Sequence, residues 1–510
     1  MTADYYDVVI LGTEIGPLAC AALLARRGFR VLVIGQGTPA PSYQAGSFRL
    51  PTRPFTLLGR GTPAVQRVLA ELAMKQRVAS LSAGTDASFQ VALPGHRFEV
   101  SHDQGRIESE SEREFPEVRR PIEDFHSNLA RLSEVFGELC QRDLMWPPET
   151  FFERRDFAKA SRALAFDKHG RGQDPLAELP ERHPFRLVAR APARFADGMD
   201  PDTQTPLRLM RLYANWYRGS LGLRSGLPGL WDLLVDRIRT AGGVVRPGEQ
   251  IDGVSFSRGA VTGVRVAASG TQIGCSYVIA GIDLVRLLPL MPERQLWEQL
   301  FERVGEPQPR YARFMLNLIV RPHGVPLGLS RDVFFVRDSS ALLSGDNLLH
   351  VQHGPSLGNA GRLLCVEALL PRRHVEDDGY LQRFRERLIE SLSDLVPFLR
   401  MHLLAMDSPH DGRPPTDCVT GRDLACPQPW TRGRRSMPIV YGYPAARALG
   451  LCAVPVRAPI KRLLLCNEQV VPGLGLEGTM LAAWSAARVV TRADKKPRWV
   501  RRSMWAKAEA

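Results

Sequence analysis

Two glycine-containing turns, one near each end of the chain, have residue types suited to ligand binding. Gly12 and Gly16 follow an apolar run and precede a segment with helical spacing. Gly473, Leu474 and Gly475 come just before an Ala-rich segment of helical character. Glycines ahead of a helix let a flat or anionic ligand approach the backbone, where free amides and the helix dipole favour negative charge. Both turns therefore predict binding of a planar or phosphate-bearing ligand.

The elements that must hold the first turn form a β-α-β unit. Residues 7–11 and 29–34 are apolar runs that predict two strands, and residues 18–27 have helical spacing. This order is typical of the dinucleotide-binding unit of a doubly wound sheet, in which the turn reads G-x-G-x-x-G and an acid follows the second strand. The alternative is that the unit serves only as the foundation of the sheet.

Three positions depart from the dinucleotide-binding pattern. Glu14 and Pro17 stand in place of the second and third glycines, and Gly35 stands in place of the ribose-binding acid. Glu14 brings bulk and negative charge to the place of a diphosphate, and Pro17 removes an N–H. Gly35 offers no side chain to a ribose hydroxyl, which leaves Gln36 as a weaker acceptor. We expect Glu14→Gly combined with Gly35→Glu to tighten dinucleotide binding.

Length and composition bound the class of protein. The 510 residues exceed one ordinary domain, and a 44% hydrophobic content with 39 Pro and 44 Gly suits a loop-rich globular protein. No apolar run is long enough to span a bilayer, and no cationic leader precedes the first strand, so we expect a cytoplasmic protein. The eight scattered cysteines form no CxxC pair and predict free thiols.

The net charge of +13, from 67 basic and 54 acidic residues, favours anionic partners. Residues 495–507 interleave Lys and Arg with Trp499, Met504 and Trp505, a pattern typical of a peptide at the surface of an anionic membrane. The alternative is a frayed basic tail. No nucleic-acid-binding module accompanies these residues, so we expect no nucleic-acid partner.

Histidines offer no convincing metal site. His350 and His353 are three residues apart on a predicted strand, so their side chains leave opposite faces and have structural roles. His402 and His410 lie at or beyond the end of a helix predicted from about residue 380, and we expect them at the surface. We predict no metal, and no catalytic residue can be named.

Further segments complete a pattern along the chain. An amphipathic helix is predicted over 231–240 and β-rich runs follow to residue 279. A buried strand is predicted over 462–466 and an Ala-rich helix over 479–490. With the N-terminal unit, these segments resemble, in the same order, the phytoene desaturase-like branch of the FAD-dependent oxidoreductases. That branch includes carotenoid desaturases, carotenoid isomerases and retinol saturase-like proteins, and the resemblance covers most of the chain.

The resemblance implies an α/β fold, in which a Rossmann-like FAD/NAD(P)-binding domain carries an inserted α+β substrate domain. The nucleotide-binding domain would be discontinuous, and a mostly helical insertion, a substrate-domain sheet with helices and a basic aromatic tail would make up the rest. The expected boundaries are 1–95, 215–290 and 445–492 for the first domain, 96–214 for the insertion, 291–444 for the substrate domain and 493–510 for the tail.

The resemblance also implies FAD as the cofactor. The positions that match the family's cofactor contacts are Gly12, Gly16, Gln36, Glu468, Gly473, Leu474 and Gly475. Glu468 would accept a hydrogen bond from a ribityl hydroxyl, and the second glycine turn would lie beside the isoalloxazine. Glu14, Pro17 and Gly35 argue against tight FAD binding. The residues expected around the isoalloxazine ring therefore match the family better than the residues expected around the adenosine part of FAD.

Two classes of function follow from the resemblance. In the first, the protein is an FAD-dependent oxidoreductase that desaturates, saturates or isomerises a long apolar polyene or lipid at the cytoplasmic face of a membrane. In the second, it is a cofactor-free relative that serves as a scaffold or carries an apolar ligand. The substrate, the direction of reaction, the electron acceptor and the oligomeric state do not follow from the residues.

Overall fold

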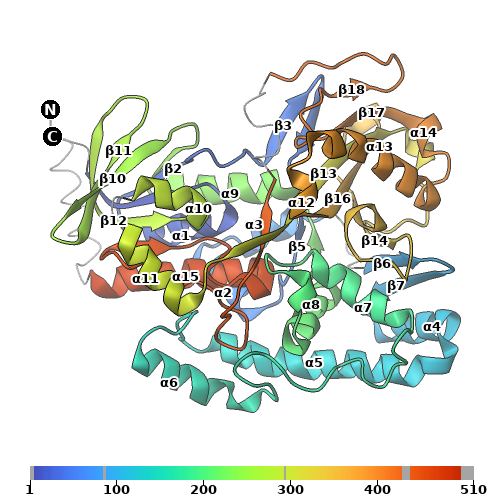
Figure 1. The fold of residues 1–510 in the computed structure, drawn as a ribbon, viewed down its shortest axis with the longest axis horizontal. Coiled ribbons are helices and arrows are strands. Elements are labelled where there is room, and N and C mark those ends of the chain that lie inside the picture. Colours follow the sequence, from blue (N-terminus) through green and yellow to red (C-terminus); the bar gives the residue numbers. More distant parts are fainter. Residues whose placement is uncertain (1–4, 84–87, 292–293, 428–436, 495–510) are drawn as a thin grey trace.

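The structure is a computed structural model that describes residues 5–83, 88–291, 294–427 and 437–494. Two β-sheets lie beside each other, and a layer of helices from residues 104–219 runs along one side of both (Figure 1). The first sheet is drawn at the left of Figure 1 and the second at the right. None of the helices in the described ranges is long and apolar enough to cross a bilayer.

The first sheet is built on parallel strands from both ends of the chain. β1 (Tyr5–Leu11) pairs in parallel with β2 (Val31–Ile34) and with β12 (Gln272–Ala280). The same parallel alignment joins β2 to β9 (Val244–Arg246) and β12 to β20 (Leu463–Leu465). An antiparallel hairpin of β10 (Ile251–Ser257) and β11 (Ala260–Val266) extends the sheet beyond β12. Parallel strands covered on both faces read as continuous apolar runs, and this explains why the sequence predicts them correctly.

Three helices cover the carboxyl edge and one face of this sheet. Every residue of α1 (Ile15–Arg26) except Arg26 is buried, and α1 packs against α9 (Gly226–Thr240) and α15 (Gly475–Ala493). All three helices begin earlier than their apolar periodicity predicts. Their first turns contain glycine or proline, which a helix tolerates there because the first N–H groups have no intrahelical partner.

The second sheet is mostly antiparallel and is centred on β13 (Gln308–Val320). β13 pairs with β16 (Arg362–Pro371), β17 (Leu403–Asp407) and β19 (Ile439–Gly442). The sheet continues through β15 (Leu348–His353), β14 (Asp332–Val336), β6 (Ser88–Leu93) and β7 (His96–Ser101), and β18 (Thr416–Asp417) lies at its other edge. The domain boundary predicted at residue 95 therefore falls inside the β6–β7 hairpin of the second sheet.

The layer that runs along one side of both sheets, residues 104–219, is mainly helical. Its helices are α4 (Gln104–Glu114), α5 (Arg119–Gln141), α6 (Phe151–Ala160), α7 (Phe185–Arg194) and α8 (Pro206–Gly219). Smaller elements complete the fold: α2 (Pro63–Glu71), α3 (Lys75–Ser80), α10 (Leu284–Leu287), α11 (Arg294–Val304), α12 (Arg372–Val375), α13 (Asp378–Leu395), α14 (Leu399–His402), and the strand pairs β3 (Ser42–Ala45) with β4 (Phe48–Pro51) and β5 (Thr56–Leu57) with β8 (Leu221–Gly222).

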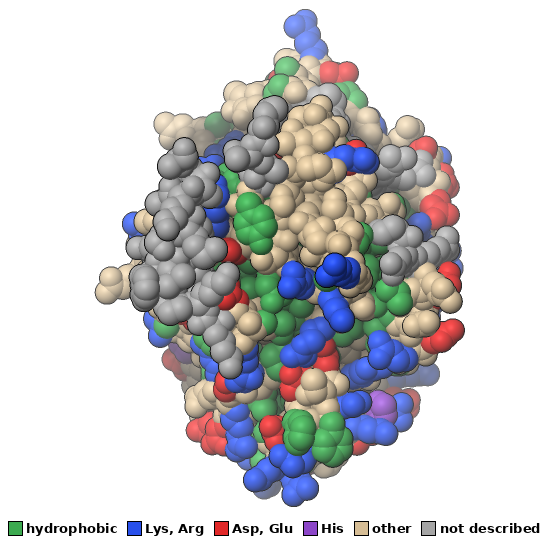
Figure 2. Space-filling view, turned by 90° about the vertical axis from the view of Figure 1, so that its left-hand side faces the viewer, with side chains coloured by type: hydrophobic (Ala, Val, Ile, Leu, Met, Phe, Trp, Pro, Cys, Tyr) green, Lys and Arg blue, Asp and Glu red, His purple; other side chains and the backbone are tan. Residues whose placement is uncertain are grey.

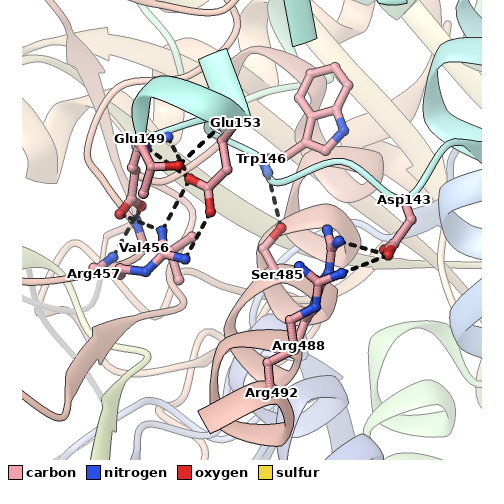
Figure 3. Close-up of polar contacts among 10 residues, drawn as sticks. Asp143, Trp146, Glu149, Glu153, Val456, Arg457, Ser485, Arg488 and Arg492 are labelled. Atoms are coloured by element: carbon pink, nitrogen blue, oxygen red, sulfur yellow. Dashed lines mark hydrogen bonds and ion pairs between the residues drawn. The ribbon is translucent and has the colours of Figure 1, made fainter. Parts of the chain in front are cut away.

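Polar contacts fasten the helical layer to the C-terminal part of the first sheet (Figure 3). Asp143 accepts hydrogen bonds from Arg488 (2.6 Å) and Arg492 (3.1 Å) of α15. In the same region, Arg457 donates to Glu153 at the start of α6 (2.9 Å). The segment before α6 is thus held to α15, and the start of α6 is held to the segment before β20, by side chains that lie more than 300 residues apart in sequence.

One surface prediction is wrong. His410 is 2% exposed and its ring lies 5.9 Å from that of Phe314. The segment is drawn into the core by a buried ion pair, in which Arg385 of α13 donates to Asp411 over 2.7 Å. His402 is half-buried at the end of α14. All eight cysteines are free thiols, as predicted.

A buried polar network crosses the second sheet. His350 is 4% exposed, and its Nε2 lies 2.9 Å from Oδ1 of Asp332 on the adjacent strand. Its Nδ1 lies 3.5 Å from Oε2 of Glu367 on the opposite side. Burial by itself lowers the pKa of His350, but the bonds to these two carboxylates outweigh it and raise the pKa to about 8. His350 is therefore a structural cation, and the described residues include no cluster that could hold a metal ion.

Stability should fall as the pH rises through about 8, because His350 then loses its proton. The folded state binds this proton more tightly than the unfolded chain, whose pKa is 6.5, so the contribution is complete below pH 6.5 and disappears above the folded pKa. We expect a loss of about 2 kcal/mol in the free energy of unfolding between pH 6 and pH 9. Urea unfolding at a series of pH values measures it. His350→Gln should flatten this slope, and an unchanged slope in the variant would contradict the assignment.

Candidate functional site

A cavity of about 590 Å³ lies where the carboxyl ends of the first sheet's parallel strands meet the second sheet. The turns after β1, β12 and β20 form one wall, and residues near β19 and α12 form the other. Ligands of doubly wound folds bind at this edge of the sheet. The lining combines polar side chains with apolar ones, and the apolar residues are Ile15, Pro17, Pro39, Pro41, Leu227, Trp231, Ile282, Val285, Val375, Met437, Pro438 and Ile439.

An ion pair lies in the wall formed by the turns after β1, β12 and β20. Glu14 is the residue that precedes α1, and its Oε2 lies 3.2 Å from Nη2 of Arg53. Oε1 of Glu468, from the turn after β20, lies 3.7 Å from Nη1 of the same arginine. Burial, reinforced by the negative charge of Glu468, raises the pKa of Glu14, while Arg53 opposes the shift. One guanidinium group is therefore shared between two carboxylates at the N-terminus of α1.

A third carboxylate reaches the same cavity from the turn after β12. Asp283 lines the cavity, and its Oδ2 accepts a hydrogen bond from the hydroxyl of Tyr441 over 3.3 Å. Burial raises the pKa of Asp283 to about 6, and the charge of Glu468 adds to the shift. The turns after three neighbouring parallel strands thus each contribute a carboxylate to one cavity.

The other two arginines of the lining already have partners. Arg286 donates a hydrogen bond to the backbone oxygen of Gln36. Arg372 forms an ion pair with Glu376, 3.0 Å away. The described lining contains four carboxylates and three guanidinium groups, so it has no surplus of positive charge for an anionic ligand.

The first glycine turn is stabilised by contacts within the protein. Gly12 has φ +102°, a conformation that favours glycine, and the N–H of Thr13 lies 3.4 Å from Oγ1 of Thr38. Trp231 of α9 donates to the backbone oxygen of Thr13 over 3.0 Å. Gly16 lines the cavity but also allows close packing of helices, because a Cβ there would lie 3.0 Å from Thr479 of α15.

Contacts within the protein occupy Gly35 and Gln36, the positions at which the dinucleotide-binding pattern places the contact with a ribose. A Cβ on Gly35 would overlap the carbonyl oxygen of Pro247, so this position has no room for an acidic side chain. The Gly35→Glu half of the expected double variant therefore clashes with Pro247, and the effect of Glu14→Gly combined with Gly35→Glu on dinucleotide binding stays a prediction. The side chain of Gln36 is also engaged: its Nε2 donates to the backbone oxygen of Ile251 over 3.0 Å, and its Oε1 accepts from the N–H of the same residue over 2.7 Å.

The second glycine turn packs against protein and does not line the cavity. A Cβ on Gly475, whose φ is +54°, would overlap the backbone oxygen of Ala196, and one on Gly473 would lie 2.9 Å from Sδ of Met199. Leu474 between them is 1% exposed. Of the residues predicted to contact FAD, the cavity lining includes Gly16 and Glu468. The structure gives Gly473, Leu474 and Gly475 a packing role, and their predicted contact with a flavin stays a prediction.

The sequence analysis missed Arg53, Asp283 and Arg286. Asp283 follows a predicted strand at residue 279, and its position becomes informative once β12 is known to run parallel to β1. Arg53 lies in an irregular segment 39 residues from Glu14, and no local pattern distinguishes it.

These residues do not fit FAD. Glu14 and Arg53 occupy the N-terminus of α1, where a dinucleotide places its diphosphate, and the nearby arginines have partners. Gly35 and Gln36 offer nothing to a ribose. The arrangement can instead hold a mainly apolar ligand that donates hydrogen bonds to carboxylates.

The free energy of unfolding of two glycine variants tests the close approach of Gly35 to the carbonyl oxygen of Pro247. Gly35→Ala should lower the free energy of unfolding by about 2–4 kcal/mol, because the new Cβ forces the backbone near Pro247 to move. Gly248→Ala in the same turn is the matched control, since a Cβ there meets nothing within 4 Å, and we expect a change within about 0.5 kcal/mol. Denaturant unfolding of both variants measures the difference. Equal effects would contradict the packing described for Gly35.

Comparisons with known proteins find similarity at the level of structure. The sequence matches no family model and no curated protein. An oxidoreductase from Methanosarcina mazei superimposes with a TM-score of 0.58 at 16% identity over 94% of this chain and 99% of its own. Cyclohexylamine oxidase from Brevibacterium oxydans gives 0.55 at 14% identity, covering 96% and 100%, and a Rab GDI from Plasmodium falciparum gives 0.51 at 11%, covering 95% and 98%.

These neighbours agree with the two-sheet architecture. The predicted α/β fold, with a Rossmann-like sheet and a separate mixed sheet, is confirmed. The same neighbours do not single out the phytoene desaturase-like branch, and they include a protein whose title is not that of an oxidoreductase. The chain therefore shares the fold of these oxidoreductases and of the Rab GDI.

Proposed function

We propose that this protein uses the flavoprotein fold to bind a mainly apolar ligand without FAD. The single observation that carries the proposal is the Glu14–Arg53 ion pair at the N-terminus of α1, with Glu468 on the other side of the arginine. The helix N-terminus attracts negative charge, and Glu14 supplies that charge from within the chain. A diphosphate placed there would meet two carboxylates and an arginine that is already paired.

The ligand class follows from the rest of the lining. Apolar side chains from both sheets line the cavity, and three carboxylates from neighbouring turns, Glu14, Asp283 and Glu468, offer hydrogen-bond acceptors within it. A ligand with an apolar body and a donor group, such as a hydroxyl or an amine, matches both features. This agrees with the second class of function expected from the sequence, a carrier of an apolar ligand.

A second candidate is the flavin-dependent oxidoreductase acting on a long apolar polyene or lipid. The observation that favours it is the coverage of the neighbours, whose fold spans 94–96% of this chain without loss of either sheet. The cavity also lies at the edge of the sheet where such a cofactor binds in this class of fold. Because the residues at that edge do not fit FAD, we place this candidate second.

An FAD titration distinguishes the two candidates. We expect the wild-type protein to leave the fluorescence of added FAD unchanged. Glu14→Gln combined with Glu468→Gln removes two negative charges, and this double variant should bind FAD at least about tenfold more tightly than the wild type. Glu386→Gln combined with Glu390→Gln, two exposed residues of α13, is the control and should leave the affinity unchanged. Micromolar or tighter binding by the wild-type protein would contradict the proposal.

We further propose that an anionic membrane surface is a partner. The predicted tail lies outside the described residues, but α6 offers independent support. Phe151 and Phe152 at its start are 69% and 64% exposed, and Arg155 lies 5.5 Å from the ring of Phe152. Figure 2 shows hydrophobic side chains standing among Lys and Arg on one face of the molecule. Exposed aromatics beside cations match the interface of an anionic bilayer.

Vesicle binding tests this partner. Phe151→Ser combined with Phe152→Ser should weaken co-sedimentation with phosphatidylglycerol vesicles by about tenfold or more, because two aromatic side chains no longer leave water on binding. The control pairs two other exposed apolar residues, Leu327→Ser with Leu342→Ser, which are 105% and 79% exposed. Equal binding by the wild type and both double variants would contradict the role of α6.

A further inference from the structure

A second cavity, of about 850 Å³, lies at the end of the β15–β16 hairpin and is separate from the site described above. Its wall is formed by the loop from Gly354 to Gly361, by β8 and by the start of β14. We propose that this cavity is a binding site for a small anion of the phosphate type. The proposal goes beyond the proposed function, because none of its residues lines the first cavity.

The guanidinium group of Arg331 is held in place in the wall. Its Nη2 donates to the backbone oxygen of Leu223 over 3.0 Å. A Cβ on Gly222 would overlap the guanidinium group, so glycine at that position is what allows it to lie against the backbone of β8. The Nε of Arg331 is buried and makes no hydrogen bond within the described residues. An arginine fixed by one nitrogen and unsatisfied at another is pre-organised to bind an oxyanion.

His353 stands beside this arginine with a free ring nitrogen. The N–H of His353 donates to the backbone oxygen of Arg331 over 2.8 Å, which places the two residues side by side on adjacent strands. Its Nε2 is buried and has no hydrogen-bond partner in the described part of the chain. Burial first, and then the positive charge of Arg362, lower the pKa of His353. A bound anion would offset that charge and give the nitrogen a partner.

The charge of the wall favours an anion. Arg224 and Arg362 also line the cavity and are exposed, and no carboxylate does so among the described residues. The nearest acidic group, Asp332, is 4.0 Å from Nε of Arg331. That carboxylate already accepts hydrogen bonds from Thr56 (3.0 Å), His350 (2.9 Å) and Gln352 (2.7 Å).

The site therefore differs from the basic patches common on protein surfaces. Ordinary surface arginines are solvated or paired with nearby acids. Here three arginines and a histidine line one cavity, and within the described residues the Nε of Arg331 and the Nε2 of His353 are buried without a hydrogen-bond partner, although Arg331 also forms a long ion pair with Asp332. A phosphate group supplies several strong acceptor oxygens and more than one negative charge, and so matches this set better than a singly charged carboxylate.

Calorimetric titration with inorganic phosphate at constant ionic strength tests the site. The wild-type protein should show saturable binding, and Arg362→Gln should weaken it at least about tenfold, one charge-assisted contact being lost. Arg362 is exposed and forms no ion pair in the described residues, so the variant should fold normally. Arg258→Gln in the β10–β11 turn is the matched control, since Arg258 is equally exposed and far from the cavity in sequence, and it should bind phosphate as the wild type does.

Three further measurements identify the ligand more closely. Acetate at the same ionic strength should not bind, whereas glycerol 3-phosphate tests whether the group is recognised on an organic molecule as well as free. If only inorganic phosphate binds, the ligand is the free ion; if the ester binds as tightly or more tightly, the ligand is a phosphorylated compound. The pKa of His353, followed by NMR, should rise on addition of phosphate. Absence of saturable binding by both phosphates, or equal binding by wild type and Arg362→Gln, would overturn the proposal.

Discussion

The ion pair between Glu14 and Arg53 determines what the main cavity can hold. The N-terminus of a helix directed at the edge of a parallel sheet carries partial positive charge and unpaired N–H groups, and in dinucleotide-binding folds the ligand's diphosphate satisfies both. Here the residue before α1 is itself a carboxylate, and its partner arginine comes from a distant loop. The side chain of Glu14 makes no capping hydrogen bond to α1, but it places a negative charge beside the N-terminus of the helix, and the cavity already contains more carboxylates than arginines.

The helices around this pair are held by buried contacts within the protein. α1 is buried along almost its whole length, and α15 is held by further buried ion pairs. Arg211 donates to Glu477 over 2.6 Å, and Arg208 donates to Asp197 over 2.6 Å in the neighbouring segment. These contacts join residues within the protein, and a shared fold does not determine what the edge of the sheet binds.

Sequence patterns predicted the architecture better than the site. Buried parallel strands and amphipathic helices leave local periodicity, which is why β1, β2, β12 and β20 were recognisable. The site depends on contacts between residues far apart in the chain: Pro247 closes the space above Gly35, and Ile251 engages Gln36. Neither contact has a local signature. His410 shows the same limit, because its place beyond the end of a predicted helix suggests the surface, whereas the ion pair of the next residue, Asp411, with Arg385 of α13 draws the segment inward.

The most direct test of the account is the visible absorption spectrum of the purified protein, combined with native mass spectrometry of the same sample. The account predicts a protein without a flavin band, at the mass of the polypeptide or of its complex with an apolar compound. A resolved flavin band, with an added mass equal to that of FAD, would contradict the central claim that Glu14 and Arg53 take the place of the cofactor's diphosphate.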